Sequence, residues 1–249
     1  MIQTMKKRGK VTVVYMTLSD PNLINDAISA MSIINVKKKD LIFLKYKQIS
    51  DFKKYEKVKE AMKRIKEILL KKKPDEVYIP AYEGGHRDHD ISNYMVSHVI
   101  NKNKIKTKVF ESPEYSLFFS FLTPKRIIDK IIRRLFKMNF SPSFITHGKT
   151  ITLKMKKDEI ETKKEMFMKY KTKNVNNTLI KNYGFCDKYR KYTQHNYLKP
   201  PFNYRCSLAY WITKIIHLIT GKGNVLKYGI GFDDFKEFRE IVKKTENIY

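Results

Sequence analysis

Short apolar runs alternate with longer amphipathic stretches along the first 111 residues, and this alternation constrains the fold more than any other feature. Four runs have the composition of strands: Val11–Thr17, Leu41–Lys45, Glu76–Pro80 and Lys108–Glu111. Three stretches between them have helical spacing of apolar residues: Asn22–Ile34, Asp51–Lys73 and Ile91–Ile100. Strands that alternate with helices form parallel sheets with right-handed crossovers. The sequence therefore predicts an α/β fold with a mostly parallel sheet and flanking helices.

The pattern loosens after Pro113. We expect one further strand at Thr150–Met155, and helices at the following ranges: Ile127–Phe136, Asp158–Tyr170 and Phe235–Lys244. No internal repeat or low-complexity linker divides the chain. We therefore expect a single domain over residues 1–249, with an α/β core at about 1–155 and a mostly helical C-terminal extension at about 156–249.

The chain carries a formal net charge of +27, from 52 Lys and Arg against 25 Asp and Glu. Only nine of the 52 are Arg, and the basic residues are spread from Lys6 to Lys244. Nucleic-acid sites usually gather Arg with aromatic residues on one face, so we interpret most of this charge as a solvated surface. Attraction to phosphate groups, an acidic glycan or a lipid surface stays open.

The expected location is cytoplasmic. Cys186 and Cys206 form no disulfide framework and no zinc motif, and Met1–Lys10 is polar and basic without a following apolar core. Leu208–Thr220 is apolar but short, and either a membrane-surface helix or a buried helix fits it. Peripheral membrane contact therefore stays open.

One segment concentrates groups that can do chemistry. Residues 80–93 read P-A-Y-E-G-G-H-R-D-H-D-I-S-N, between a predicted strand and a predicted helix. Ligands of open α/β sheets bind outside the carboxyl ends of the strands. Four residues that can bind a metal or move a proton fall within five positions there: His86, Asp88, His89 and Asp90. The alternative is a polar helix start in which an aspartate caps and the histidines are exposed.

The same segment fits H-R-D-x-x-x-x-N, the catalytic-loop pattern of protein kinases. A kinase also needs a glycine-rich loop upstream and D-F-G shortly downstream, and the sequence has neither, so we exclude this class.

The other histidines give weaker evidence of a functional role. We expect His98 on a helix face and His147 in a loop, and His195 and His217 have no companions that suggest chemistry.

The segment E-G-G-H-R-D-H-D resembles the second signature, G-G-H-x-D-H, of the PIG-L/LmbE-like zinc-dependent N-deacetylases. The stretches K-R-G-K-V-T-V-V-Y-M-T-L-S-D and K-K-P-D-E-V-Y-I-P, upstream of it, are similar to the family as well. The resemblance implies a Rossmann-like fold and an enzyme that removes an N-acetyl group from an N-acetylglucosamine-type conjugate.

The resemblance also implies roles for particular residues. His89 corresponds to a zinc ligand, with another divalent metal as an alternative. His86 corresponds to the residue near the oxyanion that donates a proton, and Asp88 to the carboxylate that supports it. Arg87 either faces an anionic group of the substrate or is solvated.

The family's first motif, A-H-P-D-D-E, does not occur in this sequence. In the family it supplies two zinc ligands and the general base, and it follows a first strand that lies centrally in the sheet. A catalytic zinc needs about three protein ligands, and each buried unsatisfied backbone group costs about 1–3 kcal/mol. We therefore expect an N-terminally truncated chain that lacks the first strand; the rival is a decayed remnant.

Three functions follow, in order of preference. The first is metal-dependent N-deacetylation of an acetylated amino-sugar conjugate, with an anionic or lipid-linked form left open. The second is an inactive relative that binds a carbohydrate or lipid-linked sugar. The third is a basic nucleic-acid-binding protein. The oligomeric state does not follow from the sequence.

Overall fold

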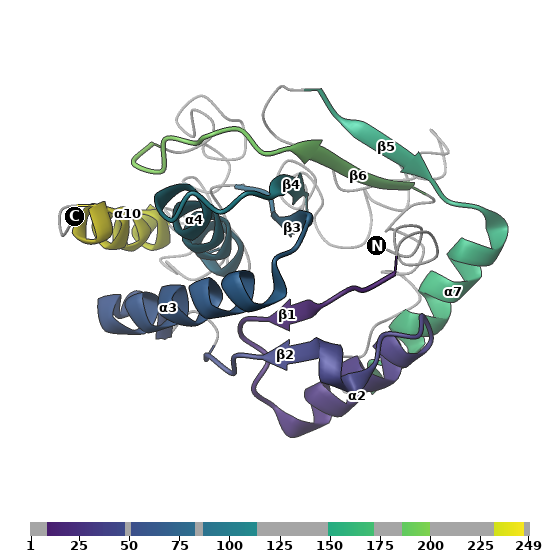
Figure 1. The fold of residues 1–249 in the computed structure, drawn as a ribbon. Helices are drawn as coiled ribbons and strands as arrows, with labels where there is room; N and C mark the ends of the chain where they lie inside the picture. Colours follow the sequence, from purple (N-terminus) through teal and green to yellow (C-terminus); the bar gives the residue numbers. More distant parts are fainter. Residues whose placement is uncertain are drawn as a thin grey trace, which may run out of the picture. The chain divides into compact units, whose positions relative to one another are not determined.

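The computed structural model describes residues 9–47, 51–82, 87–113, 149–171, 186–199 and 232–246. These residues form a mixed α/β structure (Figure 1). They fall into two compact units. The first comprises residues 9–47, 152–171 and 186–188, and the second comprises 51–82, 87–113, 149–151, 189–199 and 232–246.

The first unit is built on two parallel strands, β1 (Val13–Tyr15) and β2 (Leu41–Phe43), with Tyr15 opposite Phe43. Their rings stack with centroids 4.9 Å apart. Helix α2 (Pro21–Ser32) connects the strands, and its first turn is capped by Asp20, whose carboxylate accepts a hydrogen bond from the Asn22 amide at 2.8 Å.

A second helix and strand complete this unit. Helix α7 (Lys157–Met168) lies beside α2 in Figure 1, and it follows β5 (Ile151–Lys154). Lys163 on α7 forms an ion pair with Asp187 at 2.7 Å. The apolar core of the unit gathers residues from these elements and their connections: Ala30, Met31, Val36, Leu41, Met155 and Met166.

The second unit contains the longer strands. β3 (Glu76–Pro80) pairs in parallel with β4 (Lys108–Ser112) along its whole length, and α4 (Arg87–Lys102) connects them. The last three residues of β6 (Cys186–Lys191) belong to this unit, and the strand pairs antiparallel with β4, with Arg190 opposite Glu111.

Three helices of the second unit pack against one another: α3 (Tyr55–Lys72), α4 and α10 (Phe232–Glu246) (Figure 1). A short 3-10 helix, Asp51–Lys53, precedes α3, and Phe52 in it is fully buried. α3 ends at Lys73, whose backbone is left-handed with φ 44°, directly before Pro74. This arrangement leaves the carboxyl ends of β3 and β4 next to the start of α4.

The four strands and three helices predicted before residue 112 are confirmed, with shifts of a few residues at their ends. The helix predicted at Ile127–Phe136 lies outside the described residues. β6 was not predicted, because Cys186–Lys191 reads C-D-K-Y-R-K and has no apolar run. The helices predicted at Asp158–Tyr170 and Phe235–Lys244 are present as α7 (Lys157–Met168) and α10 (Phe232–Glu246), and β6 adds one strand to the described C-terminal residues. No helix among the described residues has the length and apolar character to cross a membrane.

Candidate active site

The motif segment lies where β3 ends and α4 begins. The Ala81 amide donates to the Ser112 carbonyl at 2.8 Å, which keeps the chain alongside β4 for one residue past β3. Helix α4 then starts at Arg87. Its first turn therefore follows the carboxyl ends of two parallel strands, the position where α/β sheets bind ligands.

The described motif residues are enclosed rather than solvated. Asp88 is 7% exposed, Asp90 is 4% exposed, and His89 is half-buried. Carboxylates in the first turn of a helix are stabilised by the free N–H groups and the positive end of the helix dipole. The alternative of a polar helix start with exposed histidines therefore does not describe His89.

Two further predicted site residues are not placed. His86 lies outside the described residues, as do Gly84 and Gly85. Arg87 is the first residue of α4, but its side chain is not described. The roles predicted for His86 and Arg87 therefore stay predictions.

The predicted metal centre depends on His89. Within the described ranges no three His, Cys, Asp or Glu side chains lie close enough together to hold a metal ion. A catalytic zinc takes about three protein ligands, so the described donors do not by themselves fit a zinc site. Any site at His89 needs donors from outside the described ranges.

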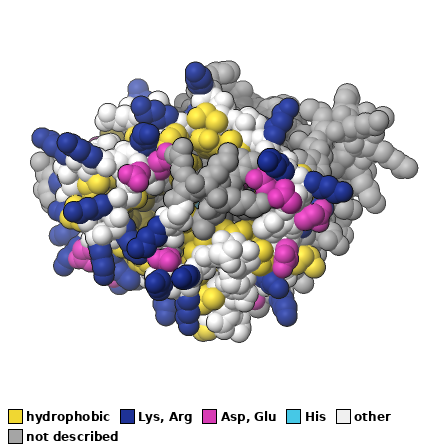
Figure 2. Space-filling model, turned by 45° about the vertical axis from the view of Figure 1, so that its right-hand side comes forward, with side chains coloured by type: hydrophobic (Ala, Val, Ile, Leu, Met, Phe, Trp, Pro, Cys, Tyr) yellow, Lys and Arg dark blue, Asp and Glu magenta, His cyan; other side chains and the backbone are white. Residues whose placement is uncertain are grey.

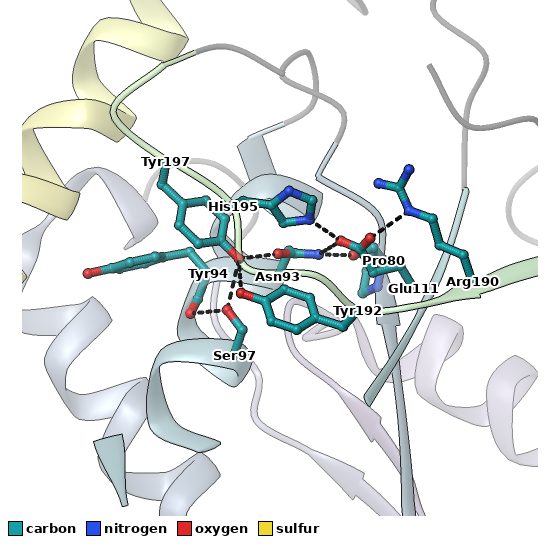
Figure 3. A network of polar contacts seen from close by, with 9 residues as sticks. All are labelled: Pro80, Asn93, Tyr94, Ser97, Glu111, Arg190, Tyr192, His195 and Tyr197. Carbon is teal, nitrogen blue, oxygen red and sulfur yellow. Dashed lines mark hydrogen bonds and ion pairs between the residues drawn. The ribbon is translucent and has the colours of Figure 1, made fainter. Parts of the chain in front are cut away.

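A buried carboxylate, Glu111, lies at the centre of a polar network beside the motif segment (Figure 3). Its Oε2 accepts a hydrogen bond from Arg190 Nε at 2.9 Å. Its Oε1 accepts from Asn93 Nδ2 at 2.8 Å and lies 2.6 Å from His195 Nε2. Glu111 is 0% exposed, so these three residues replace its hydration.

The network keeps Glu111 ionised. Burial alone would raise the pKa of Glu111, but the hydrogen bond and charge of His195 lower it, as do the Arg190 charge and the Asn93 hydrogen bond. The net result is a pKa below the usual value. Since an ionised carboxylate only accepts hydrogen bonds, His195 Nε2 carries the hydrogen that lies between them.

Asn93 joins this carboxylate to the strand end and to the interior of α4. Its Nδ2 also donates to the Pro80 carbonyl at 2.7 Å, the last residue of β3. Its Oδ1 accepts from the Tyr197 hydroxyl, which in turn lies 2.8 Å from Ser97 Oγ. Burial raises the pKa of Tyr197 well above its usual value, so its hydroxyl stays protonated and can donate.

Aromatic rings enclose the network. The His195 ring centroid lies 5.4 Å from that of Tyr82, 5.4 Å from that of Tyr192 and 5.6 Å from that of Tyr197. Tyr82 is buried and directly precedes residues 83–86. Its hydroxyl donates to the Lys199 carbonyl at 2.7 Å, which holds the segment after β6 against the end of β3.

The prediction that His195 has no companion is wrong, because Glu111 binds it. The two residues are 84 positions apart, and the sequence gives no sign of β6, the strand that brings them together. His98 does lie on α4, where burial lowers its pKa and its ring centroid lies 5.4 Å from that of Tyr94, as expected of a residue on a helix face. His147 and His217 lie outside the described residues.

Comparison with known proteins supports the fold and leaves the family open. No family model matches the chain, and no curated protein matches it. Among solved structures, it is similar to a triple mutant of a deacetylase, Orf2*T, involved in the teicoplanin biosynthetic pathway. The match has a TM-score of 0.53 at 12% identity, and it covers 78% of this chain and 90% of that one. At this identity the likeness concerns the fold, so the chain has an α/β fold similar to that of a deacetylase.

Proposed function

We propose that this chain is a metal-dependent hydrolase that removes an N-acetyl group from an N-acetylglucosamine-type sugar conjugate. One observation carries the proposal. The segment G-G-H-R-D-H, which resembles a deacetylase signature, connects the end of β3 to the first turn of α4, in a chain whose fold is similar to that of a deacetylase.

In this proposal His89 is one ligand of the metal, which is zinc or another divalent ion. When bound, such an ion polarises an acyl carbonyl and activates water. The remaining ligands come from residues beyond the described ranges, because the described donors do not complete a site.

His86 and Asp88 are assigned to the chemistry of the amide. A histidine at this point can donate a hydrogen bond to the oxyanion that forms on the acetyl group and then a proton to the departing amine. Asp88 is a buried carboxylate two residues away, suited to accept the imidazole N–H and fix the ring. Arg87 is proposed to face an anionic group of the substrate.

The net charge of +27 supports an anionic or lipid-linked conjugate as substrate. On the face in Figure 2, Lys and Arg side chains stand apart from one another with Asp and Glu among them, which fits a diffuse attraction better than a single anion site. Contact with a membrane surface is part of the proposal only for a lipid-linked substrate.

A second candidate is a relative that binds the sugar without hydrolysing it. The observation that favours it is the lack of a three-donor metal group within the described residues. Both candidates place a sugar at the start of α4 and differ in whether acetate is released.

The test measures acetate release from N-acetylglucosamine conjugates, together with bound zinc, for the wild-type chain and three variants. His89→Ala is expected to lose both metal and activity. His86→Ala is expected to keep the metal and lose activity. The control variant His98→Gln, whose residue lies further along α4, is expected to change neither metal binding nor activity. Sugar binding without acetate release would establish the second candidate. Full activity in both motif variants would refute the assignment.

A further inference from the structure

The His195 ring is held on one side only. Its Nε2 is hydrogen-bonded to Glu111, and Nδ1 has no hydrogen-bond partner within the part of the chain that is described. In Figure 3 this second ring nitrogen points away from Glu111 and from the rest of the network. The His195 side chain is 13% exposed, whereas Glu111 is 0% exposed, so the imidazole reaches from the buried carboxylate towards the surface.

The carboxylate decides what Nδ1 can do. Because Glu111 is ionised and only accepts, Nε2 must carry a hydrogen, which leaves Nδ1 to bind a ligand, as an acceptor in the neutral ring and as a donor in the imidazolium. Glu111 is itself fixed by Arg190 on β6 and by Asn93 on α4. The ring is therefore fixed in both tautomer and direction, as in a site prepared for a ligand.

The position of the pair is that of a ligand site. Glu111 is the fourth residue of the five-residue strand β4, near its carboxyl end. His195 packs on Tyr82, which directly precedes residues 83–86. Asn93 links Glu111 to Pro80 at the end of β3. The pair therefore lies at the same strand ends as the start of α4.

We propose that His195 is a substrate-binding residue of this site, held by Glu111 so that Nδ1 forms a hydrogen bond with a hydroxyl group of the bound sugar. The half-buried ring of Tyr192, whose centroid is 5.4 Å from that of His195, provides an adjacent aromatic surface of the kind that sugars contact. The inference rests on the proposed function for the identity of the sugar, and it adds a binding residue far from the motif segment in sequence.

The decisive variant is His195→Gln. The glutamine amide nitrogen is separated from Cα by the same number of bonds as Nε2, so it can still donate to Glu111, but glutamine has no nitrogen in place of Nδ1. A structural role would leave the kinetics of a folded variant unchanged. The proposal expects a roughly 3- to 10-fold rise in KM with little change in kcat, the range of one neutral hydrogen bond. His98→Gln is the matched control and is expected to leave KM unchanged.

A second measurement does not need turnover. Ring-nitrogen NMR of the wild-type chain should show His195 with its hydrogen on Nε2, and an excess of N-acetylglucosamine should shift the Nδ1 resonance. A wild-type chain that releases no acetate refutes the proposed hydrolase, and the NMR result then decides the role of His195 alone. An unchanged Nδ1 resonance, or an unchanged KM in folded His195→Gln, overturns the inference.

Discussion

Replacing Glu111 with glutamine tests how strongly the buried network stabilises the second unit. Glu111→Gln keeps the shape of the side chain, removes its charge and converts one acceptor oxygen into an NH2 donor. In the wild-type chain both carboxylate oxygens accept hydrogen bonds: Oε1 from Asn93 and His195, and Oε2 from Arg190. Whichever way the new amide turns, its NH2 group faces at least one of these donors.

The cost follows from the burial of the partners. The Arg190 side chain is 6% exposed and would keep its charge without a carboxylate. Breaking a buried ion pair by removing one partner costs about 3–5 kcal/mol, out of the about 5–15 kcal/mol that stabilises a typical domain. With a urea dependence of about 2 kcal/mol/M, a loss of about 4 kcal/mol lowers the unfolding midpoint by roughly 2 M.

The assay is urea unfolding at pH 7, followed by far-UV circular dichroism. Glu240→Gln is the control, because Glu240 also pairs with a cation, Lys243 at 2.9 Å, but both side chains are exposed. Its midpoint should stay at the wild-type value. The double variant Glu111→Leu, Arg190→Met should recover most of the loss, since no unpaired charge then stays buried. A Glu111→Gln midpoint equal to that of Glu240→Gln would refute the reasoning.

Four further outcomes are expected. Because the folded-state pKa of Glu111 is lowered, the ionised carboxylate stabilises the fold above the unfolded pKa of about 4.3, and this stabilisation is lost as pH falls through the folded pKa. Urea unfolding between pH 5 and 2 should therefore show a falling free energy of unfolding in the wild type and a smaller decrease in Glu111→Gln. Tyr197→Phe removes a buried hydroxyl that donates to Asn93 and should cost about 1–3 kcal/mol by the same assay. Lys73→Gly relieves a left-handed residue with φ 44° and should raise the free energy of unfolding by up to about 1 kcal/mol. Asp20→Ala removes the α2 cap and should lower it by about 1 kcal/mol.

The first 112 residues were predictable because their signals are local. β3 has the predicted bounds, Glu76–Pro80, since an apolar run there follows Pro74 and comes shortly before a Gly-Gly pair in the sequence. The apolar positions of α3 recur at helical spacing, and four of them are buried: Val58, Ala61, Ile65 and Leu69. Propensity and periodicity act within a few residues, so a single sequence contains them.

The network around Glu111 was not predictable, because each of its contacts joins distant positions. β6 pairs with β4 although its sequence is mostly charged; Arg190 meets the buried carboxylate of Glu111, and the Tyr189 ring packs edge-on against Phe110 of β4. In the sequence, Glu111 is the last residue of a predicted strand, and nothing beside it indicates a buried carboxylate. Of the predicted site, Asp88 and His89 are placed in the first turn of α4, whereas the roles of His86, Arg87 and the metal stay predictions.

The ion pair between Glu111 and Arg190 also bears on how β6 finds its correct alignment during folding. The two residues are direct cross-strand partners, and Phe110 faces Lys191 one step along. A slip of β6 by one residue would turn Arg190 to the opposite face of the sheet and leave the carboxylate without its guanidinium. A misaligned strand therefore leaves a fully buried charge without its partner, so the ion pair favours one register of β6.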